Sequence, residues 1–207
     1  MEHRTAPPSA TQSCLMAKIH KLAGKPGATL QLHIELRGAK PKIWRRVLVP
    51  ETITLAKLHA VIQVVFGWGG GHLHEFHVGE ERFGTPDREY DAFGEVRSER
   101  TTRLAGALGA ARTMNYVYDF GDNWQHRIKV EKTLPAAPAG TLPMCVAGAN
   151  ATPPDDCGGI YGYYDFVAAV TDPNHPEHVE MTEWIGGPWD PAAFDIEDTN
   201  FRLRNFL

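Results

Sequence analysis

The chain has 207 residues, of which 43% are hydrophobic and 22% charged, and its formal net charge is −4. This composition is typical of a folded globular domain and excludes a largely disordered chain. The acidic balance also disfavours general nucleic-acid binding, because proteins that neutralise many phosphates carry a basic surface.

The three cysteines, Cys14, Cys145 and Cys157, do not form the even, dense set of a secreted disulfide framework. The first residues lack the charged start, apolar run and small-residue cleavage site of a signal peptide. No apolar stretch approaches the roughly 18 residues of a membrane span. We therefore expect a cytoplasmic protein that has no membrane as a partner.

Residues 1–27 are expected to form a flexible N-terminal tail, and residues 28–207 a single domain. The segment from Thr5 to Ser13 mixes Ala, Pro, Ser, Thr and Gln, and residues 24–27 are turn formers. Between these two segments, residues 15–22 are expected to form a short helix.

The domain is predicted to begin with a β-hairpin and a helix. Apolar and polar residues alternate over 29–37, which indicates a half-buried strand, and residues 43–49 form a plausible antiparallel partner. Apolar side chains at helical spacing predict a helix from about Thr54 to Phe66, which Gly67 ends. A further strand is expected over about 73–78.

A second hairpin is predicted where alternation over 114–120 and 124–130 flanks a Gly-Asp-Asn turn. Further along, we expect loops over 87–100 and 135–159, a short helix over 101–108, and helices over 161–170, 175–184 and 195–206. The resulting fold class is α+β, with a mostly antiparallel sheet, one packed amphipathic helix and a helical C-terminal third.

Three histidines are the candidate metal ligands. His72 and His74 are two residues apart and so share one face of the predicted strand, where two imidazoles can converge on one ion. His126 lies on the apolar face of the second hairpin, where an unpaired polar group costs about 1–3 kcal/mol. A divalent metal such as zinc is the cofactor that this set suits. Alternatively, each ring is satisfied by a neighbouring carbonyl.

Asp119, Asp122 and Asp156 are the candidate catalytic carboxylates, each as a ligand or as a base. The first two lie at the hairpin turn, and Asp156 lies in a loop that reads Pro-Pro-Asp-Asp-Cys-Gly-Gly. Asp is also an ordinary turn residue. Cys145 and Cys157 are either additional ligands or small buried side chains.

Arg45, Arg46 and Trp124 are the candidate ligand-binding residues. Guanidinium groups bind phosphate and carboxylate well. Alternation places Arg45 on the face opposite to Trp44 and Arg46, so the pair is also consistent with an ordinary charged strand face.

Taken together, these segments resemble the plasmid pRiA4b ORF-3-like family over about residues 28–206. The motifs that carry the resemblance are residues 43–46, 58–68, 72–76, 118–126, 145–148, 153–159 and 161–163. The resemblance implies a compact prokaryotic α+β domain, often linked to plasmids or mobile elements, with no established reaction. Asp156 stands where we expect related sequences often to have Glu. Some members carry a resolvase-like label, but this chain lacks the basic helix-turn-helix that a serine recombinase uses.

The first functional hypothesis is therefore a non-catalytic binding domain that recognises a protein or a small molecule through a concave face near the second hairpin. The absence of a Gly-x-Ser-x-Gly elbow and of a phosphate loop favours it. The alternatives are a metal-dependent, hydrolase-like enzyme built on the histidines and aspartates, and a plasmid-associated DNA-interacting protein that uses Arg45 and Arg46.

Overall fold

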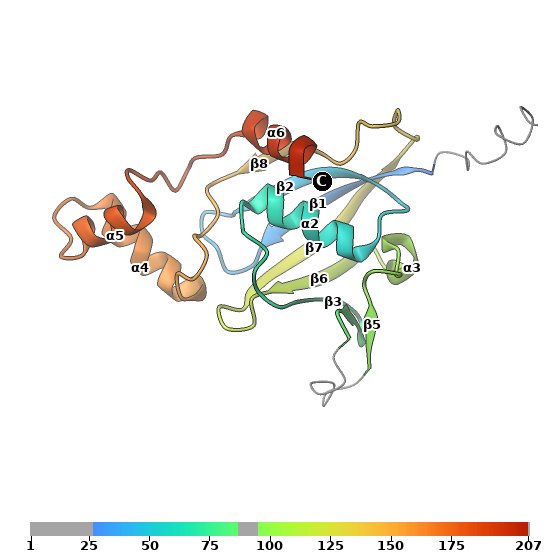
Figure 1. The fold of residues 1–207 in the computed structure, drawn as a ribbon, viewed down its shortest axis with the longest axis horizontal. Coiled ribbons are helices and arrows are strands. Elements are labelled where there is room, and N and C mark those ends of the chain that lie inside the picture. Colours follow the sequence, from blue (N-terminus) through green and yellow to red (C-terminus); the bar gives the residue numbers. More distant parts are fainter. Residues whose placement is uncertain (1–26, 87–94, 207) are drawn as a thin grey trace, which may run out of the picture.

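The computed structural model describes residues 27–86 and 95–206, which form an eight-stranded sheet and five helices (Figure 1). The predicted tail residues 1–26, with the short helix expected there, and part of the loop expected over 87–100 lie outside the described residues. The strands are β1 (Thr29–Leu36), β2 (Trp44–Pro50), β3 (His74–Val78), β4 (Glu81–Gly84), β5 (Val96–Ser98), β6 (Thr113–Tyr118), β7 (Trp124–Leu134) and β8 (Met144–Ala149).

The strand order in the sheet is β5-β4-β3-β6-β7-β1-β2-β8. Only β4 and β5 pair in parallel among the described strands, and every other neighbouring pair is antiparallel. The α+β class with a mostly antiparallel sheet is thereby confirmed. The helices are α2 (Leu55–Phe66), α3 (Leu104–Leu108), α4 (Gly159–Thr171), α5 (His178–Ile185) and α6 (Ile196–Phe206).

Helix α2 lies across one face of the sheet (Figure 1). It begins where Thr54 accepts a hydrogen bond from the amide of Lys57, and it ends where Gly67 takes a left-handed conformation with φ of +77°. Its buried face joins the alternating buried side chains of β1 in one hydrophobic core. The packed amphipathic helix therefore covers the central strands.

Helix α6 packs against both α2 and the edge strand β8. The side-chain amide of Asn200 accepts from the backbone N–H of Cys145 and donates to its carbonyl, both at 2.8 Å. Helices α4 and α5 pack on each other beyond the end of the sheet (Figure 1). Within the described residues, no helix combines the length and the apolar character that crossing a bilayer requires.

Candidate functional site

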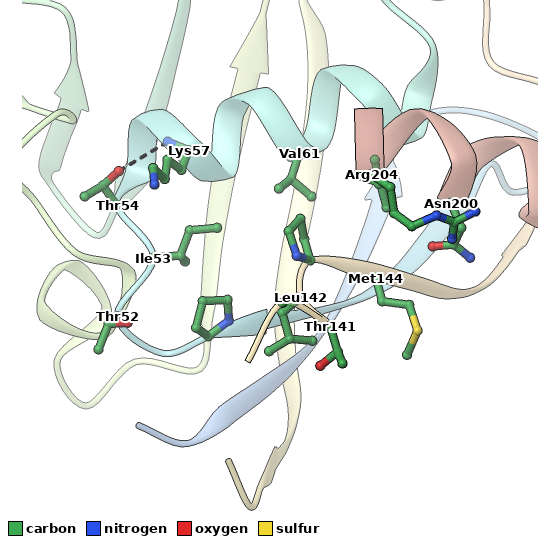
Figure 2. Close-up of a pocket in the computed structure, with 14 residues that line it drawn as sticks. Thr52, Ile53, Thr54, Lys57, Val61, Thr141, Leu142, Met144, Asn200 and Arg204 are labelled. Carbon is green, nitrogen blue, oxygen red and sulfur yellow. Dashed lines mark hydrogen bonds between the residues drawn. The ribbon is translucent and has the colours of Figure 1, made fainter. Parts of the chain in front are cut away.

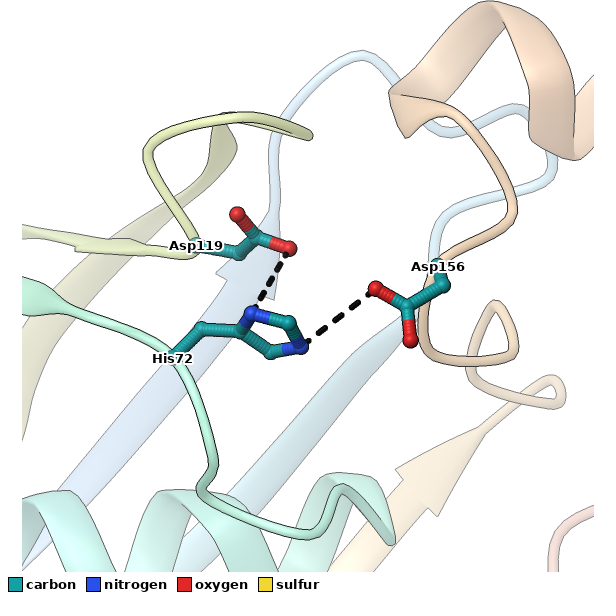
Figure 3. A group of neighbouring side chains, drawn as sticks. All are labelled: His72, Asp119 and Asp156. Carbon is teal, nitrogen blue, oxygen red and sulfur yellow. Dashed lines mark ion pairs between the residues drawn. The ribbon is translucent and has the colours of Figure 1, made fainter.

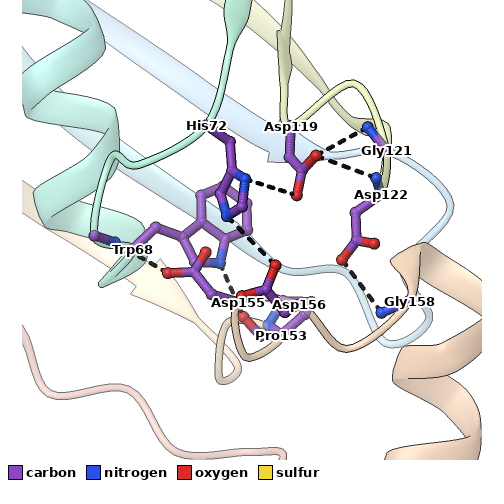
Figure 4. Close-up of polar contacts among 10 residues, drawn as sticks. Trp68, His72, Asp119, Gly121, Asp122, Pro153, Asp155, Asp156 and Gly158 are labelled. Carbon is purple, nitrogen blue, oxygen red and sulfur yellow. Dashed lines mark hydrogen bonds and ion pairs between the residues drawn. The ribbon is translucent and has the colours of Figure 1, made fainter.

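Three loops meet at one end of the sheet: the α2–β3 loop, the β6–β7 turn and the β8–α4 loop (Figure 4). The indole N–H of Trp68 donates to the carbonyl of Pro153 at 2.9 Å. The amide of Gly69 donates to the carboxylate of Asp155 at 3.1 Å. These two contacts fasten the β8–α4 loop to the segment that follows α2.

The β8–α4 loop is also fastened to the β6–β7 turn. The carboxylate of Asp122 accepts a hydrogen bond from the amide of Gly158 at 3.2 Å. Gly159 has a φ of +69°, and a Cβ there would lie 2.6 Å from the carbonyl oxygen of Asp122. Only glycine fits this backbone conformation and this close approach. The three loops thus form one connected unit.

His72, Asp119 and Asp156 come together at the junction of these loops (Figure 3). Nδ1 of His72 lies 3.6 Å from a carboxylate oxygen of Asp119, and its Nε2 lies 3.4 Å from one of Asp156. One candidate ligand atom from each residue lies within 4.8 Å of the other two. The exposed fractions of the side chains are 36% for His72, 13% for Asp119 and 72% for Asp156. The group therefore has a shielded inner carboxylate and an open outer one.

Both carboxylates of this group are held on left-handed backbone, with φ of +55° at Asp119 and +60° at Asp156. Such conformations are uncommon outside glycine, although Asp tolerates them better than most residues, and they occur often at functional sites. One oxygen of Asp119 accepts from the amides of Gly121 and Asp122 at 2.9 and 3.4 Å. Its other oxygen is thereby directed at His72.

Buried aromatic side chains pack beside the group. Trp68 stacks on Tyr118 and on Trp124, with ring centroids 5.0 and 5.9 Å apart. The ring of His72 meets Tyr118 edge-on at 5.7 Å. Because these large rings are almost fully buried, they limit how the imidazole of His72 can move.

His74 lies in a different environment from His72. Its ring stacks on that of His59, with centroids 3.5 Å apart, and its Nε2 donates to Glu99 at 2.8 Å. Burial opposes ionisation of Glu99, but the hydrogen bond from His74 and its charge still hold the pKa of that carboxyl below its usual value. Burial, with the nearby His74, lowers the pKa of His59 to about 4. His74 is thus committed to a neighbouring carboxylate.

His126 is fully buried in the core. Its Nδ1 donates to the carbonyl of Trp124 at 3.0 Å, and its ring lies edge-on to that of Trp68. Burial lowers the pKa of His126 to about 3. The three histidines predicted as metal ligands therefore occupy separate surroundings. Within the described residues, the group whose ligand atoms approach one another includes His72 without His74 or His126.

Arg45, predicted to bind a ligand, is 3% exposed and lies under the end of α2. Its guanidinium donates to the carbonyls of Val65, Ala149 and Asn150 and to the hydroxyl of Thr152, at 2.9 to 3.1 Å. Burial lowers its pKa to about 10. These bonds give Arg45 a structural role, in which it joins β2, α2 and the segment after β8.

The other two predicted ligand-binding residues are also parts of the fold: Arg46 forms an ion pair, and Trp124 is buried. Arg46 forms a two-pronged ion pair with Glu131, at 2.6 and 2.9 Å, and lies over the ring of Trp44. Trp124 is 1% exposed. As predicted, Arg45 lies on the face opposite to Trp44 and Arg46, and the structure shows that the face of Arg45 is the buried one.

Sequence reasoning missed Asp155, which fixes the α2–β3 loop, and the pair His59 and Glu99. The Pro-Pro-Asp-Asp motif was a signal for Asp155, because both of its aspartates lie at this loop junction. No local pattern pointed to Glu99.

The structure describes two of the cysteines, Cys145 and Cys157. Cys145 is buried. Burial is the main cause that raises the pKa of the Cys157 thiol to about 12.

A sequence profile of the plasmid pRiA4b ORF-3-like proteins matches residues 28–198. The chain belongs to this family. It is 39% identical over 176 residues to the uncharacterized protein y4hQ of Sinorhizobium fredii (strain NBRC 101917 / NGR234), a match that covers 84% of this chain and 89% of that protein. It is also similar to the crystal structure of a protein of unknown function, MM3350 from Methanosarcina mazei Go1, with a TM-score of 0.75 and 34% identity over 83% of this chain and 97% of that one. The family resemblance is confirmed, and the names of these relatives give no activity.

Proposed function

We propose that this pRiA4b ORF-3-like chain is a non-catalytic binding domain that holds a divalent cation on His72, Asp119 and Asp156. The open side of the cation would bind an acidic group of a protein or small-molecule ligand. The observation that carries the proposal is the convergence of these three side chains from three separate loops.

The spacing of the donor atoms supports a cation. Hydrogen bonds from imidazole to carboxylate measure about 2.7–2.9 Å, whereas the two gaps here are 3.4 and 3.6 Å. Ligand atoms about 2.1 Å from one ion lie about 3.0–3.5 Å apart at octahedral or tetrahedral angles. Because the two gaps reach different ring nitrogens, a single ion would use one of them, and the exposed side chain of Asp156 would rotate to complete the set.

The charge and chemistry of the group also suit a cation. Within the described residues, Asp119 and Asp156 have no Lys or Arg as an ion-pair partner, so the two carboxylates attract a divalent ion. One imidazole and two carboxylates form a mixed nitrogen and oxygen set, which suits Zn²⁺ and Mn²⁺. Three protein ligands leave coordination positions for a ligand from outside.

The same loops favour binding over hydrolysis. Asp122 and Asp155, the other carboxylates at the junction, accept backbone hydrogen bonds that join the loops. Their contacts support a role in holding the cation ligands in place, instead of a role as a general base. Hydrolysis remains the alternative, and a metal-dependent turnover of simple phosphate or carboxylic esters would favour it.

The test is calorimetric titration of Zn²⁺ and Mn²⁺ into tag-free, chelator-treated protein. We expect one site, and we expect His72→Ala and Asp119→Asn each to lower the affinity by on the order of 10- to 100-fold or more. Asn at position 119 retains an oxygen for the turn hydrogen bonds, so the fold should persist. The control is Asp165→Asn, which changes an exposed carboxylate on α4 outside the group. Equal affinity of the wild type and both site variants would contradict the proposal.

A further inference from the structure

A cavity of about 860 Å³ lies on another part of the molecule, between α2, α6 and the loop that leads into β8 (Figure 2). None of the three proposed cation ligands lines it. Its volume lies within the range of about 300–1,000 Å³ that is usual for small-molecule sites. The cavity is therefore a candidate site that is separate from the cation group.

The floor of the cavity is apolar. Ile53, Val61 and Leu203 line it and are almost fully buried, with 6%, 1% and 2% of their surfaces exposed. Leu142 and Met144 extend this surface toward solvent, and Met144 is 38% exposed. A ligand that covers this floor gains from the removal of apolar surface from water.

The rim of the cavity is cationic. Figure 2 shows Lys57, on the first turn of α2, at one side and Arg204, on the last turn of α6, at the other. Both side chains are exposed, and neither forms an ion pair within the described part of the chain. Arg202, two residues earlier on α6, pairs with Asp198 instead. Among the described residues, no carboxylate lines the cavity.

We propose that this cavity binds a small amphipathic carboxylate, with its alkyl or aryl body on the apolar floor and its charged group at the cationic rim, on Lys57 or Arg204. Three other polar side chains of the lining, those of Thr54, Thr141 and Asn200, are already engaged. The hydroxyl of Thr54 caps α2, and the amide of Asn200 holds β8. The two unpaired cations therefore favour a negatively charged ligand, and the apolar floor favours a ligand with an apolar body.

The test is calorimetric titration of the full chain with sodium decanoate below its micelle concentration. We expect saturable binding, no measurable binding of acetate, and weaker binding of decyltrimethylammonium, which has a similar chain and the opposite charge. The double variant Lys57→Gln, Arg204→Gln should bind decanoate about tenfold more weakly, the loss expected for one charge-assisted hydrogen bond.

The matched control is Lys132→Gln, which removes an exposed cation of β7 outside the cavity and should bind decanoate like the wild type. Substitutions at such exposed positions usually change stability by no more than about 0.5 kcal/mol, so loss of binding will not reflect unfolding. The proposal is overturned if decanoate gives no saturable binding, if the double variant binds it unchanged, or if the cationic analogue binds equally well.

Discussion

Arg45 and Arg46 are neighbours on β2 with the same chemistry and opposite environments. Arg45 is buried and donates to backbone carbonyls of α2 and of the end of β8, whereas Arg46 pairs with Glu131 on the half-exposed face. A buried guanidinium is tolerated when its donors are satisfied. The strand period could be read from the sequence, but which face is covered depends on where α2 packs.

His126 and His59 both resist protonation in the folded protein, with pKa values lowered chiefly by burial to about 3 and about 4 from the ordinary 6.5. Between pH 6.5 and these values the unfolded chain binds more protons than the folded one. Their stabilising contribution is therefore complete above pH 6.5 and is lost as the pH falls. Each group contributes a slope of up to about 1.4 kcal/mol per pH unit.

We predict that the free energy of unfolding, measured by urea denaturation, is lower at pH 5 than at pH 7. His126→Phe, which keeps an aromatic ring in the core, should make this difference smaller, and His175→Gln, an exchange on the α4–α5 connection, should leave it unchanged. Carboxyl groups interfere little, because they titrate mostly below this window. An undiminished pH difference in His126→Phe would show that the buried imidazole is not its source.

Helix α2 and the β6–β7 hairpin could be predicted because their signals are local. Thr54 caps the helix and Gly67 ends it, while alternation marks the two strands around their turn. Strands β4 and β5 were not predicted, and β8 was expected to be irregular. The sequence of β8, Met-Cys-Val-Ala-Gly-Ala, has little alternation. It is a strand because β2 pairs with it and Asn200 binds its backbone.

The β8–α4 loop depends on a glycine at its junction with α4, and Gly159→Ala should disturb it. A Cβ at this position, at φ of +69°, meets the carbonyl of Asp122 at 2.6 Å. We predict that the substitution moves Asp156 away from His72 and weakens cation binding by about tenfold or more, as measured by calorimetry.

The control is Gly186→Ala, which carries a comparable φ of +88° but has no atom within 4 Å of the added Cβ. It should cost about 1 kcal/mol in stability from backbone strain alone and leave cation affinity unchanged. Equal affinities in both variants would mean that the close contact at Gly159 does not position the loop.

At the scale of the whole molecule, the residues of the candidate site could be singled out from the sequence, but their arrangement in space could not. His72, Asp119 and Asp156 were all singled out. His72 was grouped with His74 and His126, because the alternation of side chains along the two strands suggested that the three imidazoles share one site. In the fold His74 turns to Glu99, and His126 lies in the core. The meeting of three loops depends on tertiary contacts such as Gly69 with Asp155, which no local pattern encodes.

The most direct measurement is a crystal of the full chain soaked in Zn²⁺ or Mn²⁺, with anomalous difference maps collected on either side of the metal absorption edge. The account predicts one strong peak about 2.0–2.2 Å from a ring nitrogen of His72 and from carboxylate oxygens of Asp119 and Asp156. At saturating metal, a map with no peak among these three side chains, or with its main peak elsewhere, would contradict it.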